Sequence, residues 1–125
     1  MLRFNPDGTI PADNPYATDA DPLRQPIWAE GLRNSIDFLF TPDGQLWANH
    51  NGSDDLGDDV PPEEVVINVE KGKNYGWPTI CYCIDYPGGP IGEGITARDG
   101  LEQPIYYWDP VIAPGDMIFY KIGRA

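Results

Sequence analysis

Features that mark membrane, nucleic-acid-binding or exported proteins are scarce in this sequence. No apolar run approaches the ~20 residues needed to span a bilayer. Lys and Arg together number only 8 against 20 Asp and Glu, and the net charge of −12 disfavours contact with nucleic-acid backbones or anionic lipid. The first residues lack the basic and apolar regions of a signal peptide, so we expect any export signal to lie upstream. The sequence therefore predicts neither a nucleic-acid partner nor a membrane span.

Cysteine is also scarce. The two cysteines, Cys81 and Cys83, are separated by one residue, so a bridge between them would be strained. Two thiols alone make a poor zinc site. We expect free thiols, or one bridge to a cysteine outside this chain.

A helical period of apolar residues is absent, and the composition favours short strands separated by turns. Gly and Pro number 14 each, which disfavours long helices. Four Trp, seven Tyr and four Phe argue against disorder. Apolar runs bounded by turn residues predict strands at residues 1–5, 27–30, 35–40, 45–49, 65–69, 103–108 and 117–122. The fold class predicted from this pattern is all-β, as a sandwich, a barrel or propeller blades.

A repeated turn favours propeller blades among these architectures. The sequence TPDG at 41–44 lies between two apolar runs and predicts the clearest hairpin of the chain. A similar turn, NPDG, occupies residues 5–8, and each turn follows an apolar run with an aromatic residue at its end. The spacing between them is close to the length of a propeller blade, ~40–50 residues.

Seven motifs in order resemble those of the glucose/sorbosone dehydrogenases. They are GLRNS (31–35), DGQLW (43–47), NG (51–52), GKNYGWP (72–78), IDY (84–86), EQPIYYW (102–108) and APGDMIFY (113–120). The resemblance implies a partial six-bladed β-propeller, with residues 1–125 as a fragment of a single domain. The fragment would cover about two blades of four-stranded antiparallel sheet. It also implies pyrroloquinoline quinone (PQQ) and calcium as cofactors.

The resemblance assigns three residues to the quinone. Arg33 and Asn34 match the family's cofactor-contacting pair, and Tyr86 matches a family tyrosine near the cofactor. A guanidinium binds carboxylate and quinone oxygens bidentately, and it stabilises negative charge that develops on them. The alternative for Arg33 is a structural ion pair with a surface carboxylate.

Four residues are assigned to calcium in the same way. Gly52 and Ser53 match positions whose carbonyls reach a calcium ion, although the family commonly has Pro where Ser53 stands. Glu64 and Tyr75 match a second pair of ligands, and the choice between Glu63 and Glu64 stays open because the spacing is one residue longer than usual. Residues 54–64 contain six carboxylates, which must be solvated or share a cation. A plain turn at 51–53 and a solvated acidic loop are the alternatives.

The implied function is that of a soluble, periplasmic or secreted dehydrogenase that oxidises aldose sugars or sorbosone-like aldehydes. Electrons would pass to an external acceptor. The family's general-base histidine lies upstream of the matched region, and His50, the single histidine, does not correspond to it. We therefore assign no catalytic residue to this chain and expect the isolated fragment to be inactive and to self-associate. The alternatives are a non-catalytic calcium-binding propeller that serves as a structural or interaction module and, more remotely, a lactonase-type propeller.

Overall fold

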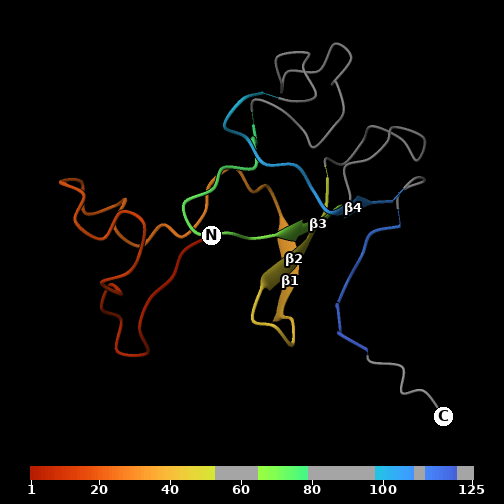
Figure 1. The fold of residues 1–125 in the computed structure, drawn as a ribbon, viewed down its shortest axis with the longest axis horizontal. Helices are drawn as coiled ribbons and strands as arrows, with labels where there is room; N and C mark the ends of the chain where they lie inside the picture. The colour runs from red at the N-terminus through yellow and green to blue at the C-terminus, as the bar shows by residue number, and fades with distance from the viewer. Residues whose placement is uncertain (53–64, 79–97, 109–111, 121–125) are drawn as a thin grey trace.

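The computed structural model describes residues 1–52, 65–78, 98–108 and 112–120. Within these ranges every element longer than an isolated bridge is a strand: β1 (Ser35–Phe40), β2 (Leu46–His50), β3 (Val65–Asn68) and β4 (Tyr106–Tyr107). They form a four-stranded antiparallel sheet in the order β1-β2-β3-β4 (Figure 1). The all-β prediction and the four-stranded antiparallel sheet are confirmed. In the part of the chain that the structure describes, no helix has the length and apolarity to cross a membrane.

The predicted hairpin is the β1–β2 pair. Phe40 lies opposite Leu46, and the turn between them is closed by the Thr41 N–H, which donates to the Gln45 carbonyl at 2.9 Å. Gly44 has a φ of 87°, a conformation that costs glycine little. The register of β1 shifts between Ser35 and Phe38, which marks an irregularity near the start of the strand.

The strand pairing aligns one end of the sheet. His50 lies opposite Ser35 on one side and opposite Val65 on the other, and Val65 lies opposite Tyr107. The first residue of β1, the last of β2 and the first of β3 therefore share one row. The segments that precede β1 and follow β2 must leave the sheet at the same end, because the two strands are antiparallel.

The core lies on and beside the central strands. Its buried apolar members are Ala29, Ala48, Val65, Ile67, Val69 and Tyr75. By contrast, β1 is largely exposed, with Phe38 at 59% and Phe40 at 66% of their accessible surface. The interior is thus built around β2 and β3 and the segments that cross them.

The predicted strands at 1–5 and 27–30 are reduced to a single bridge between Leu2 and Ile27. The Arg3 N–H donates to the Pro26 carbonyl at 2.8 Å, and the Trp28 N–H donates to the Met1 carbonyl at 3.0 Å. Pro26 has no N–H with which to extend the ladder, which is why the pairing is short.

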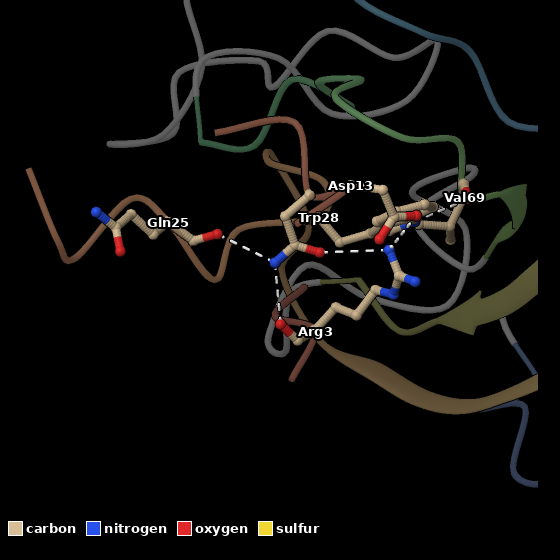
Figure 2. A network of polar contacts seen from close by, with 6 residues as sticks. Arg3, Asp13, Gln25, Trp28 and Val69 are labelled. Carbon is tan, nitrogen blue, oxygen red and sulfur yellow. Dashed lines mark hydrogen bonds and ion pairs between the residues drawn. The ribbon is translucent and has the colours of Figure 1, made fainter. Parts of the chain in front are cut away.

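A polar network fixes the excursion between these two segments (Figure 2). The Arg3 guanidinium pairs with Asp13 at 3.0 Å and lies over the Trp28 ring at 4.8 Å. The buried Asn14 side chain donates to the carbonyls of Arg3 and Gln25, at 3.1 and 3.0 Å. These contacts attach residues 13–25 to the edge of the fold.

Residues 28–31 lie beside residues 72–77. Glu30 bridges Asn74 in parallel, and the Trp77 N–H donates to the Gly31 carbonyl at 3.1 Å. Gly31 has a φ of 71°, and a Cβ there would lie 2.2 Å from the Asn74 Oδ1. The close packing of the two segments therefore requires glycine at this position, two residues before Arg33.

The C-terminal strand predictions hold only in part. The strand expected at 103–108 is confined to Tyr106–Tyr107, since Pro104 cannot donate to a ladder. Residues 117–120 of the strand expected at 117–122 are not in a strand, and the Met117 N–H donates instead to the Asp37 Oδ2 at 2.9 Å. The Met117 N–H is thus bonded to a side chain of β1 rather than to the main chain of a neighbouring strand.

Candidate functional site

The candidate site lies at the end of the sheet where β1 begins and β2 ends. Arg33 and Asn34 directly precede β1, and Asn51 and Gly52 directly follow β2. The Asn51 N–H donates to the Asn34 carbonyl at 3.0 Å, which joins the two segments. The fold thus brings together two of the three residues that the sequence assigned to the quinone, Arg33 and Asn34, and the first of those assigned to calcium, Gly52.

The Arg33 guanidinium is held against main-chain oxygens. Its Nη1 donates to the Asn51 carbonyl at 3.2 Å and also to the Gly52 carbonyl. The guanidinium carbon lies 5.5 Å from the centre of the Trp77 ring, within the range of a cation–π contact. A cation, two carbonyl dipoles and an aromatic face therefore meet at one point.

His50 supports this arrangement from inside the sheet. The residue is fully buried, and its Nε2 accepts hydrogen bonds from the N–H groups of Arg33 and Asn34, at 3.2 and 3.3 Å. Burial, together with the nearby Arg33 charge, lowers the pKa of the imidazole to about 4. The ring is therefore neutral at pH 7. Sequence reasoning excluded His50 as the general base and missed this role, because a single histidine in a strand carries no signal of its partners.

The oxygen atoms around Asn51 fit a hard cation. The Asn51 Oδ1 is buried and has no hydrogen-bond partner among the residues that the structure describes. This amide oxygen and the carbonyls of Asn51 and Gly52 are of the type that calcium prefers. In the described ranges there is no group of three or more His, Cys, Asp and Glu side chains that could hold a metal. The sequence motif contained Asn51, but only the structure singles out its side chain.

Tyr75 contributes its side chain to the core. The residue is buried, and its hydroxyl accepts from the Glu70 N–H at 2.9 Å and donates to the Asn68 carbonyl. Burial raises the pKa of the phenol above its usual range. Its neighbour Trp77 contacts Arg33, but the assignment of Tyr75 to calcium stays a prediction.

The remaining assigned residues are Ser53, Glu64 and Tyr86. They lie outside the described residues, as does the rest of the acidic segment. Asn34 is exposed, and its main chain, through the bonds to His50 and Asn51, ties it to the site.

A further segment, residues 113–117, is attached next to this end of the sheet. The Asn49 Oδ1 accepts from the Asp37 N–H at 2.7 Å, and the Asn49 amide donates to the Gly115 carbonyl. The Asp37 carboxylate accepts from the Met117 N–H at 2.9 Å. Ala113 has a φ of 48°, which is uncommon for a residue with a side chain. The register irregularity in β1 thus anchors a loop beside the site.

Comparisons of sequence and of structure both find that this chain is similar to sugar dehydrogenases. Aldose sugar dehydrogenase YliI of Escherichia coli is 38% identical over 126 residues, which cover 97% of this chain and 31% of that protein. The crystal structure of the soluble aldose sugar dehydrogenase of Escherichia coli in the apo-form superposes with a TM-score of 0.72 and 32% identity, over 92% of this chain and 31% of that one. The PQQ-bound aldose sugar dehydrogenase of Streptomyces coelicolor gives a TM-score of 0.57 at 25% identity, over 86% of this chain and 25% of that one.

The chain thus spans about a third or less of the length of these relatives. The family profile described as glucose / sorbosone dehydrogenase matches residues 1–124, which is nearly the whole chain. The chain therefore belongs to the glucose/sorbosone dehydrogenase family, as a partial β-propeller.

Proposed function

We propose that this chain forms part of the PQQ- and calcium-binding pocket of a dehydrogenase that oxidises aldose sugars or sorbosone-like aldehydes. The observation that carries the proposal is the meeting of the Arg33 guanidinium with the Asn51 and Gly52 carbonyls at one end of the sheet. A fixed positive group suits the anionic PQQ ring, and uncharged oxygen ligands suit calcium. The two kinds of group lie side by side here.

Arg33 and Trp77 would serve the quinone. PQQ, when bound, accepts the hydride that leaves the sugar. The guanidinium binds carboxylate or quinone oxygens and stabilises negative charge on them, and the Trp77 ring offers an apolar face for a planar group. Asn34 and Tyr86 are proposed as further contacts. The proton acceptor for the sugar hydroxyl is proposed to be a histidine outside this chain, because His50 is buried and engaged with the main chain.

The carbonyls of Asn51 and Gly52, together with the Asn51 side-chain oxygen, would hold calcium. A carbonyl oxygen has two lone pairs, so it can accept from Arg33 and still face a cation. Ser53, Glu64 and Tyr75 are proposed to complete the calcium ligands, with Glu63 as the alternative to Glu64. Removal of calcium would then weaken PQQ binding, because a cation held by these carbonyls would attract the negatively charged PQQ beside Arg33.

Titration of the protein that carries this chain with PQQ tests this proposal. In excess calcium, we expect saturable quenching of tryptophan fluorescence, and we expect Arg33→Ala to weaken the affinity by about tenfold or more, as loss of a charge-assisted bond does. Arg24→Ala is the matched control, since Arg24 also lies over an aromatic ring, Tyr16 at 4.6 Å, away from the site. Equal affinities for the two variants would contradict the proposal.

The buried Asn51 oxygen, which has no hydrogen-bond partner within the described ranges, also suits a second function, that of a calcium-binding structural or interaction module without catalysis. The same titration separates the two. A module of this kind binds calcium but shows no saturable PQQ binding and no reduction of a redox dye in the presence of aldoses. A lactonase-type activity would appear as lactone hydrolysis that needs calcium and no quinone.

We further propose that copies of the isolated chain associate with one another. An apolar groove of about 960 Å³ runs between the first residues and the β1–β2 hairpin. Phe4, Phe38 and Phe40 line it and are each at least half exposed. Uncovered apolar surface of this kind drives association. Sedimentation velocity should show dimers or larger species, and a cooperative monomer at high concentration would argue against it.

A periplasmic or secreted location, an external electron acceptor and residues 1–125 as a fragment of a single domain stay predictions from the family resemblance. Fractionation of the expressing cells tests the location. A dye-coupled assay of the protein that carries this chain tests the need for an acceptor.

A further inference from the structure

We infer that His50 is the positioning residue for Arg33. Its imidazole acts as a shared acceptor for two consecutive main-chain N–H groups, and this contact sets the direction in which the Arg33 side chain leaves the backbone. The consequence for cofactor binding rests on the proposed function, whereas the contact itself can be measured without any cofactor.

The geometry requires one tautomer of the ring. The Arg33 nitrogen lies 3.2 Å and the Asn34 nitrogen 3.3 Å from the His50 Nε2. Both nitrogens are donors, so Nε2 must present its lone pair and the ring proton must sit on Nδ1. His50 is fully buried as the last residue of β2. A buried acceptor fixed by a strand is a firmer support than a mobile surface side chain.

The turn that carries Arg33 is fixed at three points. The Gly31 carbonyl accepts from the Trp77 N–H at 3.1 Å, and the Asn34 carbonyl accepts from the Asn51 N–H at 3.0 Å. His50 fixes the two N–H groups between these carbonyls. Without that acceptor, the middle of the turn could rotate while its ends stayed attached.

One short segment therefore holds Arg33 at both ends. His50 binds the Arg33 main chain, while the carbonyls of the next two residues, Asn51 and Gly52, bind its guanidinium. Any rotation of the turn moves the guanidinium relative to the carbonyls proposed for calcium. The effect of His50 on the quinone should then pass through Arg33 rather than through general stability.

The first experiment measures the contact directly. His50 is the single histidine of these 125 residues, and in a ¹⁵N spectrum of the protein that carries this chain its ring signals are identified as those lost in His50→Gln. We expect an unprotonated Nε2 with scalar couplings across hydrogen bonds to the amide nitrogens of Arg33 and Asn34. A protonated Nε2, or couplings to neither amide, would overturn the inference whether or not the protein binds PQQ.

The second experiment is a double-mutant cycle of His50 and Arg33 in the protein that carries this chain, with PQQ affinity measured in excess calcium. His50→Phe removes the acceptor, and His50→Gln keeps an acceptor oxygen. We expect His50→Phe to weaken binding by about tenfold, His50→Gln to restore most of it, and Arg33→Ala to reduce the effect of His50→Phe to less than about twofold.

The outcomes of the cycle separate the inference from the proposed function. Equal losses from His50→Phe in both backgrounds would overturn the positioning role. If His50→Phe does not fold, His50→Gln decides alone: its affinity should stay within about threefold of the parent, and a larger loss that persists in Arg33→Ala overturns the inference. Couplings from Nε2 to both amides in a protein that binds no PQQ would leave the contact standing and contradict the proposed function.

Discussion

In two regions of the molecule an arginine side chain lies over a tryptophan ring, and the two arginines have different partners. Arg3 lies 4.8 Å from the centre of the Trp28 ring, and Arg33 lies 5.5 Å from that of Trp77. Arg3 pairs with Asp13 and so attaches a surface excursion to the fold. Arg33 donates to two main-chain carbonyls beside a buried amide oxygen.

The stacked pair alone is therefore no signature of a cofactor site. The difference lies in the surrounding groups: two main-chain carbonyls accept hydrogen bonds from the Arg33 guanidinium, and the His50 imidazole accepts from the Arg33 main-chain N–H. A positive group that is pre-organised in this way loses little entropy when it binds a ligand. The two regions should respond differently to substitution, pH and metal.

The largest effect is expected at Gly31, which brings the Arg33 turn against residues 74–76. In Gly31→Ala the new Cβ would lie 2.2 Å from Asn74 Oδ1 and 2.4 Å from the Gly76 nitrogen, at a positive φ. We expect a loss of about 4 kcal/mol or more in the free energy of unfolding, measured with urea. Gly44→Ala is the control, because its φ is also positive but nothing lies within 4 Å; it should cost about 1 kcal/mol. Similar losses at both sites would contradict the packing described for Gly31.

The two regions should also lose stability in different pH ranges. The pKa of His50 falls from 6.5 to about 4 on folding, so the unfolded state binds more protons below pH 6.5. Stability is full above pH 6.5 and should fall by about 3 kcal/mol as the pH drops toward 4. Arg3 holds the pKa of the Asp13 carboxyl below its ordinary value of 3.8, so that contribution is lost only at lower pH. Urea midpoints in His50→Gln should lack the step between pH 6.5 and 4; a step of the same size would refute the assignment to His50.

Two asparagines offer a comparison with a smaller expected effect on stability. The buried Asn14 side chain donates to two carbonyls, and Asn14→Ala should lower the free energy of unfolding by about 2 kcal/mol without changing calcium affinity. Asn51→Ala removes an oxygen that has no hydrogen-bond partner in the described part of the chain, so it should cost less stability. It should weaken calcium binding by about threefold to tenfold, measured by calorimetry. Unchanged calcium affinity in Asn51→Ala would remove this oxygen from the proposed site.

The sequence predicted the elements whose signals are local. The hairpin at 35–40 and 45–49 is confirmed within one residue, because the turn residues and the apolar runs on either side act together. The strand at 117–122 was not found over 117–120, because its partner is the Asp37 side chain, 80 residues away. Long-range contacts of side chains leave no local pattern.

The site was predictable to the extent that motif order identified the family. Arg33, Asn34 and Gly52 came from that order, and the structure brings them together. The roles of His50 and Asn51 depend on the pairing of β1 with β2, since only that pairing brings the two N–H groups before β1 to the imidazole at the end of β2. Composition and spacing contain no information on such a contact.

The central claim is that an anionic quinone held by Arg33 and a calcium ion held by the adjacent Asn51 and Gly52 carbonyls occupy one pocket. Calorimetric titration of the protein that carries this chain tests it most directly, with PQQ added in calcium and in chelator, and with calcium added in the presence and absence of PQQ. Linkage requires each ligand to raise the affinity for the other by the same factor, which we expect to be about tenfold or more. Affinities for PQQ that are equal with and without calcium would contradict the claim.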